Sequence, residues 1–410
     1  MTAPPAPATR VALLGSATLT IMAAAIMSPS LPSMRADFRS DVLVRLALTV
    51  TCLAIAVSAP IAGVVADRFG RKPLLTGSLV LYAVAGTAGL YAPGLGALIF
   101  SRAVLGLAVG GIMTAISALI ADLFTGPARA RFLGLQQAFA SLGGVVFLPL
   151  AGALAAVGWR APFWLYAASL LVVPIVVVAV TDRPAEAAPA AAPPPGRSAP
   201  YLGIYAVALL ATLVFFMVPT QLPFLLADLT ASTVVVGVAV AASTASSAVA
   251  AVGYAALRRR LGFAAITTLS VALLGAGWAI VGLTTALPVI LAGVLIGGAG
   301  VGFAVPNLNT WLSELAPPAR RGRVLGGLVT AIFLGQFLSP LVLAPLVGAL
   351  GIARSFVVAG VACVVLTVAT TAAASLRRRR PAAGPAGLSS TADPSESSVA
   401  PSSRGSSDDQ

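Results

Sequence analysis

Long apolar segments alternate with short polar ones twelve times along the chain. The apolar segments lie at 11–31, 43–66, 73–92, 96–120, 131–157 and 160–181, and then at 201–222, 234–256, 263–284, 287–308, 324–349 and 352–375. A helix needs about 20 mostly apolar residues to cross the hydrocarbon core of a bilayer. The pattern therefore predicts twelve transmembrane helices, in two groups of six.

The composition agrees with this pattern. Hydrophobic residues make up 59% of the 410 residues, and charged residues only 9%, against about 25% in an ordinary soluble domain. So few charges cannot cover the surface of a water-soluble fold. The first segment has the length of a span and eleven similar segments follow it, so we expect a retained helix and no signal peptide. The sequence predicts an all-α integral membrane protein.

Two stretches outside the spans lack apolar periodicity. Residues 182–200 are rich in proline and alanine, which predicts an extended, semi-rigid linker between the two groups of spans. Residues 377–410 begin with four arginines and continue with serine, proline and glycine, which predicts a disordered tail behind a basic anchor. The expected units are thus a six-helix bundle at 10–181 and a second one at 201–376.

The basic residues predict the orientation in the membrane. If the amino terminus is cytoplasmic, 19 of the 25 basic residues fall in cytoplasmic segments and five on the opposite side. By the positive-inside rule both termini and the linker are cytoplasmic. The net charge of +13 is spread over loops and does not gather on a soluble face, so we expect no nucleic acid partner. Lys72 is the one lysine, a bias typical of a GC-rich bacterial genome, and we expect a bacterial plasma membrane.

Several kinds of chemistry are excluded by absent residues. The chain has no histidine, which rules out a Ser-His-Asp triad, a His-ligated zinc and a His-ligated haem. Cys52 and Cys363 each lie inside an apolar segment, so a disulfide framework or a thiolate cluster is not expected. We predict no enzyme activity, no cofactor and no metal.

The two groups of spans are related by an internal repeat. At a shift of 192 residues, glycine, acidic and arginine positions coincide in the same order around the fourth and fifth spans of each group. The matched pairs are Gly106 and Gly298, Gly110 and Gly302, Asp122 and Glu314, Arg129 and Arg321, Arg131 and Arg323, Gly134 and Gly326, and Gly143 and Gly335. A duplicated six-helix bundle is a transporter architecture, with a substrate site near the midplane between the halves.

The loop between the second and third spans is the most informative segment. Residues 63–72 read GVVADRFGRK. A glycine at position 70 lets two helices reverse direction within a few residues, and a carboxylate at position 67 can meet a helix N-terminus or an arginine. The pattern resembles the loop signature of the major facilitator superfamily, and it is carried by Gly63, Asp67, Arg68, Gly70, Arg71 and Lys72.

The resemblance covers nearly all of 10–376 and implies a twelve-helix transporter of two pseudo-symmetric bundles. In that family the loop latches the halves on the cytoplasmic side. It implies that Asp67 caps the eleventh helix and that Arg71 pairs with Asp122. In the second half Leu257 stands where Asp67 stands, so an asymmetric latch is expected.

Arg102 lies inside the fourth apolar segment, in the sequence RAVLGLAVGG. A buried arginine in lipid is costly and should face the bundle interior or water. It resembles the arginine of the family's helix-4 signature, which implies a role in coupling. The alternative is an arginine that snorkels to the outer interface. Its repeat counterpart is Val294, so the repeat itself does not require the charge.

The fifth span carries a partial match to the drug-exporting branches of the family. Its sequence SLGGVVFLPLAG has leucine where those branches have glycine before the proline. The residues concerned are Gly143, Gly144, Pro149 and Gly152. The match favours export, and the alternative is a generic kinked helix.

Uncharged polar residues within spans are candidate substrate contacts, and interhelical packing is the alternative for each. They are Gln136, Gln137, Asn307, Asn309 and Gln336, together with Phe216 as a possible apolar wall. No aspartate or glutamate is expected at mid-span, so proton antiport would have to use Asp37, Asp228 or the latch acids.

The sequence thus indicates a monomeric exporter of small hydrophobic or drug-like molecules that works by alternating access, with protons as possible coupling ions. Two alternatives stay open. One is an importer or uniporter of a small metabolite such as a sugar or organic acid. The other is a membrane sensor or scaffold that keeps the fold without transport.

Overall fold

A computed structural model describes residues 6–181, 199–230, 232–317 and 320–379. Within these ranges every regular element is a helix, and twelve helical stretches are long and apolar enough to cross a membrane. The predicted all-α, twelve-span class is confirmed. Residues up to Thr370 form one compact unit, and the residues after it form another, of which the described part is helical.

The first six spans, here called the N half, are built from ten helical elements. They are α1 (Pro7–Ala25), η1 (Ser28–Ser30), α2 (Leu31–Phe38), α3 (Asp41–Phe69), α4 (Arg71–Thr87), η2 (Ala88–Leu90), α5 (Leu95–Leu123), α6 (Gly126–Ala155), η3 (Ala161–Ala168) and α7 (Ser169–Ala179). The predicted spans therefore stand, with ends that differ by a few residues.

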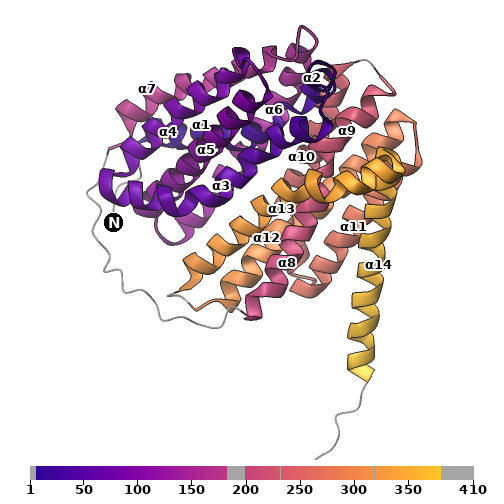
Figure 1. Cartoon of the computed structure of the whole chain (residues 1–410). Coiled ribbons are helices and arrows are strands. Elements are labelled where there is room, and N and C mark those ends of the chain that lie inside the picture. The colour runs from indigo at the N-terminus through magenta and orange to yellow at the C-terminus, as the bar shows by residue number, and fades with distance from the viewer. Residues whose placement is uncertain (1–5, 182–198, 231, 318–319, 380–410) are drawn as a thin grey trace, which may run out of the picture. The chain divides into compact units, whose positions relative to one another are not determined.

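The last six spans up to Thr370, here called the C half, form the second group of six. They are α8 (Ala199–Phe215), α9 (Met217–Ala227), α10 (Thr233–Arg258), α11 (Phe263–Leu283), α12 (Leu287–Leu315), α13 (Arg321–Leu350) and α14 (Ile352–Arg379). The two halves form separate groups of helices in Figure 1, and they meet along α3 and α13 and along α6 and α10.

Two spans that the sequence predicts as continuous helices are broken. The first span is interrupted between Ala25 and Ser28, and the seventh at Phe216. A proline follows each break, Pro29 in the first span and Pro219 in the seventh. Proline has no N–H for the carbonyl four residues back and its ring clashes with that carbonyl. Each break falls where this hydrogen bond would be missing.

Helix α14 extends to Arg379. The start of the predicted disordered tail, 377–379, is therefore helical and the prediction is wrong for these residues, because the last apolar span continues without a breaker into the arginine run. The rest of the tail, and the linker at 182–198, lie outside the described residues.

The repeat found in the sequence is also a repeat of helix contacts. A Cβ on Gly106 of α5 would collide with the carbonyl oxygen of Thr51 in α3, and one on Gly298 of α12 would lie 2.5 Å from the carbonyl oxygen of Ser243 in α10. Thr51 and Ser243 are themselves 192 residues apart. Small residues let helices approach closely in lipid, where apolar burial does not drive association. The matched glycines therefore specify the same helix crossing in both halves.

Replacing either glycine by alanine is expected to destabilise the protein by roughly 1–3 kcal/mol, the usual effect of overpacking. Thermal unfolding in detergent of Gly106→Ala and Gly298→Ala measures this. Gly77→Ala in α4 is the matched control, because a Cβ there has nothing within 4 Å and alanine favours a helix by about 1 kcal/mol. Equal unfolding temperatures for all three variants would contradict the expectation.

Candidate functional site

The two halves are joined by hydrogen bonds at one end of the helices, here called the closed end. The Ser28 hydroxyl of η1 donates to the carbonyl of Pro219 in α9, at 2.7 Å. The Thr233 hydroxyl at the start of α10 donates to the carbonyl of Gly152 near the end of α6, also at 2.7 Å. Both bonds are accepted by backbone carbonyls. A proline makes the Pro219 carbonyl available, and a close helix contact makes the Gly152 carbonyl available. They fix the halves directly to each other.

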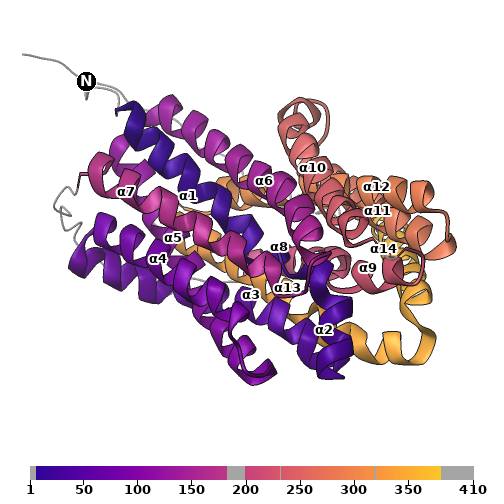
Figure 2. The same cartoon turned by 90° about the horizontal axis from the view of Figure 1, so that it is seen from above.

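Helices α6 and α10 lie side by side at this seam (Figure 2). A Cβ on Gly152 would lie 2.5 Å from the carbonyl oxygen of Thr233, and one on Gly144 would lie 3.0 Å from the Thr244 methyl group. Gly143 faces the backbone of Thr18 in α1 of its own half. Three of the four residues singled out in the fifth span therefore serve close helix approach. The fourth, Pro149, lies within α6, which continues through it.

An aromatic side chain of the C half inserts into the N half at the closed end. Phe224 of α9 is 3% exposed and belongs to the hydrophobic core of the N half. The guanidinium of Arg45 lies 4.5 Å from its ring centre and that of Arg35 lies 5.5 Å away. Asp41 also pairs with Arg35 at 3.7 Å and with Arg45 at 3.8 Å. Because Arg45 is only 4% exposed, its attraction to the ring is weakly screened.

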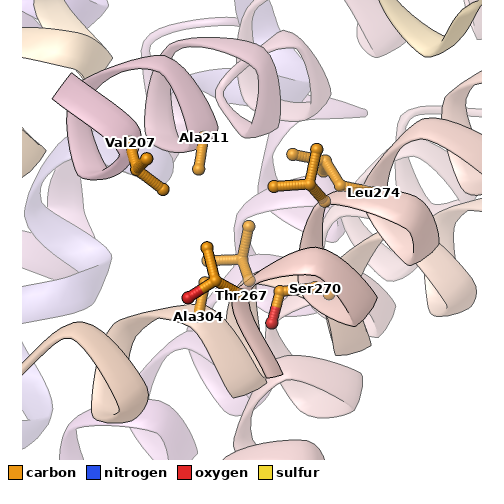
Figure 3. Close-up of a pocket in the computed structure, with 9 residues that line it drawn as sticks. Val207, Ala211, Thr267, Ser270, Leu274 and Ala304 are labelled. Carbon is orange, nitrogen blue, oxygen red and sulfur yellow. The ribbon is translucent and has the colours of Figure 1, made fainter. Parts of the chain in front are cut away.

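A cavity of about 480 Å³ lies next to these arginines. Charged groups of both halves line it, namely Arg35, Asp41, Arg45, Asp228 and Arg354. A smaller pocket of about 10 Å³ lies inside the C half between α8, α11 and α12 (Figure 3). That volume is at the lower limit for one water molecule, so this pocket is a packing gap and no substrate site.

The hydrogen bonds and aromatic contacts that join the halves among the described residues all lie toward the closed end or at mid-helix. Residues 63–72 lie at the other end, where α3 turns into α4. Gly70 has a φ of +94°, a left-handed value that favours glycine, so the tight reversal expected from the sequence is present. Gly63 has open space around it, Lys72 is the second residue of α4, and Asp67 and Arg68 are exposed.

One of the two latch contacts implied by the sequence is present. The Arg71 guanidinium lies 3.1 Å from the Asp122 carboxylate, both partly buried, and this pair joins α4 and α5 within the N half. Among the described residues, no hydrogen bond or ion pair joins Asp67 to the eleventh span, α13, and the N-cap residue of α13 makes no side-chain cap. In this conformation the halves are held together at the closed end, and residues 63–72, at the opposite end, do not hold them together.

Arg102 is fully buried, so the interpretation as a snorkelling arginine is wrong. One nitrogen of its guanidinium donates to the carbonyls of Ala85 and Gly86 in the last turn of α4, at 2.6 and 2.7 Å. The rings of Phe163 and Tyr166 lie 5.0 and 4.9 Å away. A helix C-terminus carries partial negative charge, and aromatic faces attract cations. The charge is thus balanced without a carboxylate, and it ties α4, α5 and η3 together.

The polar candidates within spans have different surroundings. The Gln336 carbonyl of α13 accepts a bond from the Cys52 thiol of α3 at 3.3 Å, across the two halves. The Asn307 amide is buried and donates to the Phe263 carbonyl and the Thr267 hydroxyl inside the C half. The others have separate surroundings: Gln136 is half-buried, Gln137 and Asn309 are exposed, and Phe216 is buried at the break of the seventh span.

Neither the contact of Phe224 with Arg45 at the closed end nor the burial of Gln221 was predicted from the sequence. Gln221 is completely buried in α9. A signal was present for it, since a glutamine between Pro219 and Pro223 interrupts an apolar segment. For Phe224 the sequence allowed either an apolar pocket wall or a lipid-facing side chain, and only its neighbours in the fold identify it as a contact between the halves.

Comparison with known proteins places this arrangement in a family. The model of the Major Facilitator Superfamily matches residues 13–204 and again 204–402. The solved structure of a bacterial homologue of the human lysosomal transporter Spinster, in an inward-facing and occupied conformation, superposes with a TM-score of 0.74 over 92% of this chain and 98% of that one. At 15% identity this likeness shows the fold alone.

Two curated relatives match shorter segments. The efflux pump dotC of Dothistroma septosporum is 36% identical over 110 residues, which cover 27% of this chain and 19% of that protein. The class C tetracycline resistance protein of Escherichia coli is 33% identical over 161 residues, which cover 37% of this chain and 39% of that protein. The matches span well under half the length of these relatives.

Removing the Phe224 ring is expected to favour opening of the closed end. Phe224→Ala would lose two cation–π contacts that are together worth roughly 1–2 kcal/mol. This loss shifts the equilibrium between the closed and the open state of this end by about five- to thirtyfold. Spin labels at Val42 of α3 and Leu229 after α9, both exposed, would report the separation in a Cys52→Ser, Cys363→Ser background. Phe100→Ala, 70% exposed on α5, is the control. An unchanged distance distribution would exclude Phe224 as a closing contact.

Proposed function

Because this chain belongs to the Major Facilitator Superfamily, we propose that it exports small hydrophobic or drug-like molecules by alternating access. It is a multi-pass membrane transporter of that family. The observation that carries export is the similarity of its segments to an efflux pump and to a tetracycline resistance protein. The glycine-rich fifth span, which packs on α10 through Gly144 and Gly152, supports the same proposal.

The orientation follows from the charges. With the arginine-rich loops and both termini in the cytoplasm of a bacterial cell, the closed end faces outward and residues 63–72 face inward. The conformation described here is then inward-facing. Ser28, Phe224 and Thr233 form the contacts that must separate when the transporter opens outward. A monomer in the bilayer is sufficient for this motion, since both halves belong to one chain.

The loop at 63–72 acts in the opposite state. When the inward end closes, α3 approaches the start of α13, and Asp67 can reach the N-terminus of that helix. The N-terminus of α13 has no side-chain cap to compete with the carboxylate, and a helix N-terminus attracts negative charge. The Arg71–Asp122 pair stays within the N half and holds the loop in place. Within this loop, Asp67 is therefore the residue that we propose makes and breaks a contact between the halves.

Protons are the proposed coupling ions, and the acids available to them lie near the helix ends. Among the described residues, no aspartate or glutamate lies in the middle of a span. Asp37 accepts a bond from the Trp159 indole at 2.5 Å, while Asp228 lines the cavity at the closed end. Asp228 is the better placed of the two, because it faces a space that widens when the halves part there.

Flux measurements in proteoliposomes test the proposal. With an imposed pH gradient, tetracycline and other hydrophobic drugs are expected to move against the proton flow, and xylose and small organic acids are not. Movement of a sugar or an acid alone would instead identify an importer or uniporter of a metabolite. Absence of flux for the whole panel would favour a sensor or scaffold with this fold.

Asp67→Asn is expected to lower drug flux by about tenfold or more and to leave membrane abundance and the unfolding temperature unchanged. The reason is that an anion at a helix N-terminus contributes up to about 2 kcal/mol, and only the inward-closed state makes this contact. Initial rates in proteoliposomes measure the effect. Glu314→Gln, which neutralises an exposed acid at the same end of α12, is the control. Full activity of Asp67→Asn would refute the latch.

A further inference from the structure

The two broken spans meet each other at the seam. The first span breaks before η1 and the seventh before α9, and the Ser28–Pro219 hydrogen bond joins the two segments that follow the breaks. Discontinuous helices at the interface of repeats commonly form the substrate sites of transporters, because the interrupted backbone leaves polar groups available. Polar side chains that lie near these breaks without a partner are therefore candidate substrate contacts.

Two such side chains lie directly after the breaks. Gln221 of α9 is completely buried, and neither its amide nitrogen nor its amide oxygen has a hydrogen-bond partner. Ser30 of η1 is also completely buried, with its hydroxyl unpartnered. Asn307 differs in part, since its amide nitrogen donates two bonds inside the C half and only its amide oxygen lacks a partner. Gln221 and Ser30 belong to opposite halves.

An unpaired amide in a dry interior destabilises the state that contains it, because its bonds to water are lost and not replaced. A leucine of similar size would avoid this loss. The structure of the closed end thus gives Gln221 no stabilising role. Its neighbours Met217 and Leu222 pack in the core of the C half, whereas Phe224, one turn away, packs in that of the N half. Gln221 therefore lies where the halves must separate.

We propose that Gln221, with Ser30 from the other half, forms a neutral hydrogen-bonding subsite for the transported molecule. This inference rests on the proposed transport function. Separation of the halves at the closed end uncovers the amide, which offers two donors and an acceptor. The complementary ligand chemistry is an uncharged edge with a donor beside an acceptor, such as a carboxamide or a hydroxyl next to a carbonyl. An amide cannot offset the burial of a full charge.

Transport of two probes by purified protein in proteoliposomes tests the subsite. Tetracycline carries a carboxamide and several hydroxyl and carbonyl groups, whereas tetraphenylphosphonium has no hydrogen-bonding group. In Gln221→Leu the KM for tetracycline is expected to rise by about three- to tenfold, the effect of one or two neutral hydrogen bonds. The rate for tetraphenylphosphonium and the unfolding temperature should not fall. Gln221→Asn, which keeps the amide, should recover part of the affinity.

A merely structural glutamine gives a different result. In that case Gln221→Leu would leave the KM for tetracycline unchanged and would only raise the unfolding temperature, and the subsite would be overturned. An equal loss of flux for both probes would also overturn it, because the amide would then not discriminate between them.

Labelling gives a readout that does not depend on flux. In a Cys52→Ser, Cys363→Ser background, Gln221→Cys is expected to react with a membrane-impermeant maleimide added from outside, and saturating tetracycline should slow the reaction. No labelling in any condition overturns the subsite. Labelling and protection by tetracycline, without flux of either probe in the wild type, would support the subsite and contradict export.

Discussion

Direct backbone contact between the two halves at one end of their helices is the constraint on which the rest of this structure depends. In a bilayer, lipid tails are as apolar as the helices, so association requires close packing and hydrogen bonds. Gly152 allows close packing of α10 against α6, and the Ser28 and Thr233 hydroxyls donate the hydrogen bonds. Because these contacts involve few residues, they can be broken together without unfolding either half.

The two halves share helix contacts but differ in chemistry. Gly106 and Gly298 make equivalent approaches to α3 and α10. Arg102, however, occupies a site enclosed by α4 carbonyls and aromatic rings, whereas its counterpart Val294 lies in the same apolar core as Trp278. The buried charge thus stiffens the N half alone. The acid of the 63–72 loop is likewise confined to this half, since Leu257 stands at the matching position of the C half.

Separate types of interaction operate at the two ends. At one end an ion pair, Arg71 with Asp122, is internal to the N half. At the other end, Phe224 couples the halves through aromatic contact with Arg45. Between the ends, a hydrogen bond across the halves joins two neutral groups, the Cys52 thiol and the Gln336 amide oxygen.

The sequence by itself determined the twelve spans and the repeat, because these depend on composition and on matched positions along the chain. The Arg71–Asp122 pair was implied by the resemblance of residues 63–72 to the family's loop signature, and the structure contains it. The sequence did not reveal the breaks at Ala25 and Phe216, since proline is tolerated within membrane helices when neighbours satisfy the freed carbonyls. Only the tertiary structure decided which end is closed and that Gln221 is unpaired. Those properties arise from contacts between segments 81 to 191 residues apart, and local pattern carries no record of such contacts.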